Sequence, residues 1–188
     1  MKKLILSIAV IITTLIACNG NNKTPDVAKK EMGGDTAVQT IIATFPIKEI
    51  LTNYLQLKNA LAKDNSKDAA TAANAMVAVL GKVEMKGLSK AEMKSYMDIA
   101  DDLKENAEHI GANAGKIDHQ REHFIMLSKD VTDLIKTFGN GGQTLYKDFC
   151  PMANEGKGAL WISETKDIKN PYLGKAMPTC GSVKQTMQ

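Results

Sequence analysis

The sequence contains few of the residues that mark common catalytic and nucleic-acid-binding sites. Only 5% of its 188 residues are aromatic, and it has three histidines, three cysteines and one tryptophan. The 24 lysines and arginines nearly balance the 21 acidic residues, which excludes the strong positive field typical of nucleic-acid-binding proteins. The sequence contains no phosphate-binding glycine loop, paired-carboxylate motif or nucleophile with a matched base. We therefore expect neither an enzyme nor a nucleic-acid-binding protein.

The N-terminus combines two lysines with the apolar run 4–16. This run is too short to cross a bilayer, which needs about 20 residues, and is typical of a secretory signal. It ends in Leu-Ile-Ala-Cys, which resembles the lipobox of bacterial lipoproteins and implies cleavage before Cys18 and acylation of its thiol. We expect residues 1–17 to be a signal peptide and the lipid on Cys18 to anchor the protein to a membrane of the bacterial cell envelope, facing the periplasm. The alternative is an ordinary signal peptide with a chance cysteine.

Residues 18–42 are mostly polar and contain several glycines and asparagines. They have too little apolar surface to offset the entropy lost on ordering, so we expect a flexible tether. The remainder divides at a change of pattern. Residues 43–138 have helical periodicity, whereas in residues 139–188 this periodicity disappears and proline and glycine recur.

Four successive segments within 43–138 carry apolar residues at helical spacing, which predicts an all-α, up-down four-helix bundle. The four stripes are Ile50-Tyr54-Leu57-Leu61, Ala69-Ala73-Met76-Leu80-Val83, Met93-Tyr96-Ala100-Leu103-Ala107-Ile110 and Phe124-Leu127-Val131-Leu134-Phe138. Ser66 and Asp118 are candidate N-caps, and Ser89 with Glu92 forms a capping-box pattern. Gly87 suits a left-handed helix stop.

Residues 139–188 retain aromatic and aliphatic side chains despite losing helical periodicity. We expect an ordered, loop-rich cap packed on the bundle, with residues 159–163 compatible with a short β-strand.

Two sulfur pairs lie in this cap. Cys150 precedes Met152 by two residues, and Met177 precedes Cys180 by three. Thiolate and thioether ligands select Cu(I), so the four sulfurs could form a copper site if the cap brings the cysteines together. The spacing alone favours the alternative, a structural disulfide between the two cysteines. It would stabilise the protein by about 3 kcal/mol and leave the methionines as packing residues.

The histidines supply a second set of candidate ligands. His119 and His123 are four residues apart, so on a helix they share a face and could chelate a metal. His123 lies at the edge of the apolar stripe, which suits a packing residue as well as a ligand, and it is the better candidate of the two. His109 lies nearly opposite the stripe of its own helix and is expected only to be solvated. Arg121 and Glu122 are expected to lie on a solvated helix face.

Several short motifs occur together over residues 48–186. They are residues 118–124 (DHQREHF), 149–153 (FCPMA), 161–163 (WIS) and 168–172 (IKNPY), with Gly174, Met177 and Cys180-Gly181. Together they resemble a bacterial periplasmic domain of unknown function that also forms the C-terminal end of copper and heavy-metal efflux adaptor (membrane fusion) proteins. The chain lacks the adaptor's barrel and hairpin regions, so it would be a stand-alone version of that end domain.

The resemblance implies a helical domain associated with metal export or metal resistance. It implies a metal site formed by Cys150, Met152, Met177 and Cys180, with His123 as a possible fifth ligand. The first functional hypothesis is an envelope lipoprotein that binds a soft metal ion, copper above all, near a heavy-metal efflux complex. The alternative is a disulfide-stapled helical interaction domain that docks on an envelope complex without metal.

Overall fold

The computed structural model describes residues 45–188. The predicted signal peptide, the predicted lipidation site Cys18 and the predicted tether therefore lie outside the described residues. Within 45–188, no helix is both long and apolar enough to cross a membrane.

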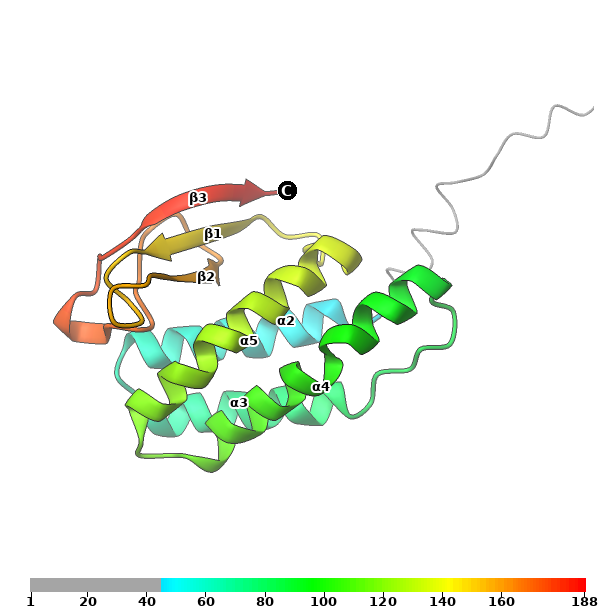
Figure 1. The fold of residues 1–188 in the computed structure, drawn as a ribbon, viewed down its shortest axis with the longest axis horizontal. Coiled ribbons are helices and arrows are strands. Elements are labelled where there is room, and N and C mark those ends of the chain that lie inside the picture. The colour runs from blue at the N-terminus through cyan, green and yellow to red at the C-terminus, as the bar shows by residue number, and fades with distance from the viewer. Residues whose placement is uncertain (1–44) are drawn as a thin grey trace, which may run out of the picture. The chain divides into compact units, whose positions relative to one another are not determined.

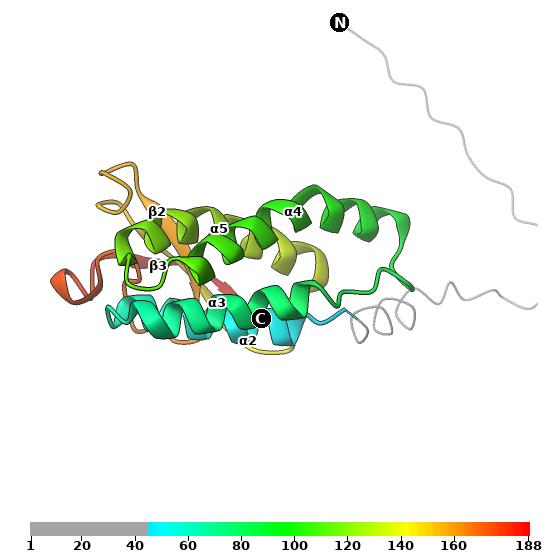
Figure 2. The same ribbon diagram turned by 90° about the horizontal axis from the view of Figure 1, so that it is seen from below.

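Four helices form the larger part of the described chain, as the apolar stripes predicted. They are α2 (Ile47–Ala62), α3 (Ser66–Leu80), α4 (Lys90–Ala112) and α5 (Ile117–Phe138). Helix α2 packs along α3, and α4 packs along α5, while α3 also contacts α4 (Figures 1 and 2). The mostly helical class is confirmed, and the up-down order of the helices stays a prediction.

The predicted helix ends are confirmed in part. Ser89 and Glu92 form the capping box, with each side chain accepting from the other's backbone N–H. The N-cap of α3 is Asn65, whose side chain accepts from the N–H of Asp68, so the prediction of Ser66 is wrong. The prediction of Asp118 is also wrong, because α5 begins at Ile117 and places this carboxylate inside the first turn.

Helix α3 ends at Leu80, well before Gly87. The N–H groups of Lys82 and Val83 bond to carbonyls three residues earlier, which tightens the chain after Gly81 into turns. Val83, the last residue of the predicted stripe, therefore lies outside the helix, although it packs partly buried against the core.

A small antiparallel sheet follows the helices. It consists of β1 (Leu145–Cys150), β2 (Ala159–Ser163) and β3 (Ser182–Met187) in the order β2-β1-β3. Strand β2 is the one that the sequence predicted. It contacts α5 and α2, so the sheet lies on that side of the helices, as Figure 1 shows. Strand β3 forms the outer edge and is mostly exposed.

Aromatic side chains join β2 to the helices. Trp161 is fully buried and packs edge-on against Tyr172, with ring centroids 5.9 Å apart. The Tyr54 hydroxyl accepts a hydrogen bond of 3.0 Å from the backbone N–H of Ile162 and lies 2.8 Å from the Ser128 hydroxyl. Burial raises the pKa of Tyr54, so it remains a neutral phenol that holds β2 on α2 and α5.

Two ionisable side chains, one on α2 and one on β1, are fully buried. Lys58 is fully buried and donates to Glu164 over 2.7 Å. Asp148 on β1 is also fully buried, and neither of its carboxylate oxygens has a hydrogen-bond partner among the described residues. Burial raises the pKa of Asp148 to about 6, so its charge is costly to the fold near neutral pH.

A disulfide joins Cys150, at the end of β1, to Cys180, just before β3. The Asn170 side chain donates to the carbonyl oxygen of Cys180 over 2.7 Å and accepts from the N–H of Tyr172 over 2.8 Å. These bonds fix the connection between β2 and β3, which includes the short 3₁₀ helix η1 (Gly174–Ala176). The sheet region is therefore ordered by a covalent link as well as by packing.

Candidate metal centre

The three histidines of the sequence come together between α4 and α5. Each offers one ring nitrogen to a group in which all three nitrogens lie within 4.8 Å of one another. The His109 ring stacks on that of His123, with centroids 4.3 Å apart and planes 11° apart. The His119 ring stands edge-on to that of His123, with centroids 4.7 Å apart.

The turn between α4 and α5 brings these histidines together. His109 lies in the last turn of α4, and His119 lies in the first turn of α5. Between the helices the chain turns at Gly115, whose φ of +92° is readily adopted only by glycine. Residues at similar distances before and after such a turn face one another when the two helices pack side by side.

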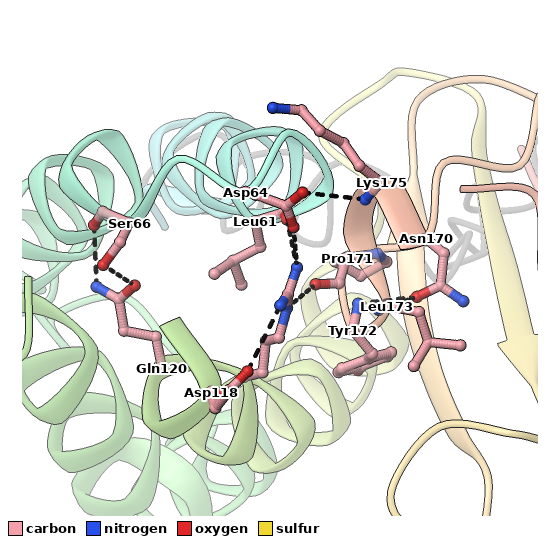
Figure 3. A network of polar contacts seen from close by, with 11 residues as sticks. Leu61, Asp64, Ser66, Asp118, Gln120, Asn170, Pro171, Tyr172, Leu173 and Lys175 are labelled. Carbon is pink, nitrogen blue, oxygen red and sulfur yellow. Dashed lines mark hydrogen bonds and ion pairs between the residues drawn. The ribbon is translucent and has the colours of Figure 1, made fainter. Parts of the chain in front are cut away.

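Gln120 fixes this hairpin against the start of α3. Its buried side chain donates a 3.0 Å bond to the carbonyl oxygen of Ser66 and accepts a 2.7 Å bond from the Ser66 hydroxyl (Figure 3). It also donates a 3.0 Å bond to the carbonyl oxygen of Ile110. The Ser66 hydroxyl also accepts from the N–H of Gly115 over 2.6 Å. A single polar cluster thus joins the end of α4, the turn and the start of α5.

Arg121 anchors the same part of α5 on another side. Its guanidinium donates to the carbonyl oxygens of Pro171 and Leu61, at 2.9 and 3.1 Å, and to the Asp64 carboxylate at 2.6 Å (Figure 3). Arg121 lowers the pKa of Asp64, which keeps that partner ionised. Asp64 also accepts from the backbone N–H of Lys175. The histidine-bearing turns of α5 are therefore fixed to α2 and to the C-terminal region.

Each histidine ring has an oxygen atom beside one of its nitrogens. Nδ1 of His123 lies 3.0 Å from Oδ1 of Asn106, and Nδ1 of His119 lies 3.2 Å from a carboxylate oxygen of Glu122. Nε2 of His109 lies 3.8 Å from Glu105, which is an ion-pair distance rather than a hydrogen bond. These oxygens orient the rings and leave the other nitrogen of each ring available.

Burial and charge favour the neutral form of the central ring. His123 and His119 are half-buried, and His109 is exposed. Burial, followed by the charges of His109 and His119, lowers the pKa of His123. A neutral imidazole is the form that binds metals, and three imidazoles are a ligand set typical of zinc and copper. The cluster is thus chemically suited to hold a transition metal ion.

The structure separates the sulfur residues from the histidines. Cys150 and Cys180 form the disulfide, so neither is a thiolate, and neither belongs to the histidine group. Met152 and Met177 are exposed, by 55% and 37%. Of the five predicted ligands, only His123 lies in a cluster suited to a metal. The sulfur site stays a prediction for the reduced protein.

Two other expectations are corrected. His109 is solvated as predicted, but its ring also stacks on the ring of His123. The contact arises because α4 and α5 pack side by side with the face that carries His109 turned toward α5. Arg121 does not lie on a solvated face, since only 14% of its side chain is exposed and it binds three other segments. Glu122 is exposed as expected, yet it contacts His119. The signal that could have identified His109 is its position just before a glycine-containing turn that precedes His119.

Comparison with known proteins gives one match. Residues 50–143 match the model of a protein family described as "Protein of unknown function (DUF3347)". The matched segment is half of the chain and contains all three histidines, whereas all three strands of the sheet lie beyond it. No curated protein and no solved structure matches the chain significantly.

Proposed function

The chain belongs to the DUF3347 family of proteins of unknown function, and we propose that it is an envelope lipoprotein that binds a transition metal ion, copper above all, in metal export or resistance. The observation that carries the proposal is the meeting of His109, His119 and His123, whose ligand nitrogens lie within 4.8 Å of one another. In their neutral form, three imidazoles at this spacing present three nitrogen ligands to one ion.

The surroundings of the cluster support a binding role. Gln120 and Arg121 hold the helix that carries His119 and His123, so the backbone positions of these ligands are fixed before an ion arrives. The stacked rings of His109 and His123 need only side-chain rotation to direct their nitrogens at one ion. The exposed ring of His109 leaves the cluster open to solvent. An ion can therefore enter and leave, which suits a protein that captures a metal and passes it on.

The cellular context of the proposal comes from the N-terminal sequence and from the resemblance to the end domain of efflux adaptors. A lipid on Cys18 would keep the cluster near the membrane, where its effective concentration beside an efflux complex is high. Mass spectrometry of the protein extracted from cell envelopes tests this part. An acylated N-terminal Cys18 is expected, and a free, unmodified cysteine would remove the anchor from the proposal.

Metal titration of the full-length, tag-free protein tests the binding itself. Copper and zinc are titrated against a competing chelator, and His109→Ala/His119→Ala/His123→Ala is compared with the control Met97→Ala, which removes an exposed thioether from α4. We expect the triple variant to weaken binding by more than about a hundredfold, because loss of even an outer partner costs about 10–100-fold. Equal binding by the variant and the wild type would refute the histidine site.

The second candidate function is metal-free docking by a disulfide-stapled domain. The Cys150–Cys180 disulfide favours it, since this bond withdraws both thiols from metal chemistry. The two functions differ in the titration above. An intact disulfide together with no uptake of copper or zinc would favour docking.

A further inference from the structure

The oxygen atoms that are hydrogen-bonded to His119 and His123 assign the hydrogen of each of these two rings. The Asn106 side-chain N–H₂ donates to the carbonyl oxygen of Asp102 over 2.8 Å, so its Oδ1 faces His123. Oδ1 can only accept a hydrogen bond, and Nδ1 of His123 must therefore carry the hydrogen. The lone pair of His123 is left on Nε2.

The same reasoning applies to His119. The Glu122 carboxylate accepts from Nδ1 of His119, which leaves the lone pair on Nε2. Nε2 of His109 lies 3.8 Å from the Glu105 carboxylate, a distance that places a negative charge beside this ring without a hydrogen bond. His119 and His123 thus each have one nitrogen bonded to an oxygen and one free to bind an ion.

From this arrangement we infer that the site takes a divalent first-row transition ion, Cu²⁺ or Zn²⁺, and that Asn106, Glu105 and Glu122 are its positioning residues. The inference rests on the proposed function and specifies its ion. Three nitrogen donors without sulfur suit borderline divalent ions, of which Cu²⁺ binds most tightly in the usual order. Monovalent copper prefers the soft thiolates and thioethers that are missing from this group.

The two carboxylates add a charge argument. Glu105 and Glu122 supply two negative charges beside a set of neutral ligands, which matches the charge of a divalent ion. A carboxylate that accepts the outer N–H of an imidazole also makes the ligand more basic, and loss of such partners typically weakens metal binding by about 10–100-fold. Three protein ligands leave a coordination position open to solvent or to a partner.

The experiment measures Zn²⁺, Cu²⁺ and Cu(I) binding to the full-length, tag-free protein, with the disulfide kept intact by using ascorbate as the only reductant. Glu105→Gln/Glu122→Gln removes the two charges beside the rings. Asp98→Asn/Glu108→Gln removes two charges from exposed residues of α4 that pair with lysines, and it serves as the matched control. We expect about tenfold weaker Zn²⁺ and Cu²⁺ binding in the first variant and little change in the control.

Asn106 provides a second, independent readout. Asn106→Leu removes the oxygen that accepts from His123 and is expected to weaken Zn²⁺ binding by about tenfold. Asn106→Asp keeps an acceptor oxygen at this position and is expected to bind Zn²⁺ as the wild type does. The Cu²⁺ electron paramagnetic resonance spectrum should show couplings to imidazole nitrogens, with one fewer coupled nitrogen in His123→Ala. Circular dichroism confirms that each variant is folded.

The outcomes separate this inference from the proposed function. If no ion binds to the wild type, the proposed function fails. If Cu(I) binding depends on His123 while Zn²⁺ and Cu²⁺ binding does not, the protein binds metal but the divalent assignment is overturned. The positioning role is overturned if the first variant and its control bind Zn²⁺ equally well.

Discussion

The α4–α5 hairpin and the C-terminal sheet are stabilised in different ways. The hairpin buries an apolar stripe on each helix and gains the polar contacts of Gln120, and it contains no cysteine. The sheet has an exposed outer strand, β3, which is joined to β1 by backbone pairing and by the Cys150–Cys180 disulfide. The comparison teaches that the candidate metal centre and the disulfide belong to separate regions. Each can therefore be altered while the other is monitored.

Removal of the disulfide should have the largest effect. In Cys150→Ala/Cys180→Ala the free energy of unfolding is expected to fall by about 3 kcal/mol, because the bond closes a long loop with a sequence separation of 30. Urea unfolding monitored by the fluorescence of Trp161, the single tryptophan of the chain, measures this loss. Metal affinity should change less than about twofold, since distant sites act independently. A loss of metal binding comparable to that of His123→Ala would make the sulfurs part of the site.

Gln120→Leu should affect the hairpin instead. The substitution leaves the carbonyl oxygens of Ile110 and Ser66 and the hydroxyl of Ser66 without the Gln120 side chain as a partner. We therefore expect the free energy of unfolding to fall by about 2 kcal/mol. Zinc affinity should fall as well, because the start of α5 loses a contact that places His119 and His123. Urea unfolding and zinc titration measure the two effects. Gln56→Leu, on the exposed face of α2, is the control, and a variant equal to it in both measurements would contradict this role.

Asp148→Asn should cause the smallest change in the free energy of unfolding at neutral pH, and the sign of this change depends on pH. The folded-state pKa of Asp148 is about 6, above the usual value of 3.8. The protonated carboxyl therefore makes its full contribution to the stability of the wild type below about pH 4, and this contribution is lost as the pH rises through 6. Asparagine carries no charge at any pH. The rise of this pKa from 3.8 to about 6 costs the wild type about 3 kcal/mol of stability between pH 4 and pH 8, a loss that the variant does not have. The buried amide without a partner costs the variant about 2 kcal/mol at every pH. We therefore expect the variant to lie about 2 kcal/mol below the wild type at pH 4 and about 1 kcal/mol above it at pH 8.

Urea unfolding of the Asp148→Asn variant and the wild type at several pH values checks this difference. Asp133→Asn removes an exposed carboxylate from α5 and provides the control. A difference between Asp148→Asn and the wild type that is constant from pH 4 to pH 8 would argue against a charge buried beneath the sheet.

Features set by neighbouring residues could be predicted from the sequence. The apolar stripes, the Ser89–Glu92 capping box and the shared face of His119 and His123 depend on helical spacing alone, and the structure has all three. The role of His109 could not be predicted in the same way, because it depends on which face α4 turns toward α5. That face is set by packing between the helices rather than by local spacing.

The sheet shows a similar limit. Strand β2 could be anticipated because its residues are apolar and mostly buried. Strand β3 could not, since its residues are exposed and lack a clear alternation of apolar and polar side chains. It forms because β1 offers a free edge and the disulfide holds Cys180 nearby. The spacing of the two cysteines allowed this bond but did not require it.

The position of Gly115 has a consequence for the order of folding. The ligands on either side of it lie within residues 109–123, whereas the disulfide joins residues 30 apart and the Tyr54–Ile162 contact spans much of the chain. Contacts between near neighbours in sequence form faster than those between distant segments. We therefore expect the hairpin to acquire its metal-binding arrangement early in refolding, before the sheet closes. Stopped-flow refolding with zinc present from the start would show this as metal uptake ahead of the Trp161 signal, and simultaneous changes would contradict it.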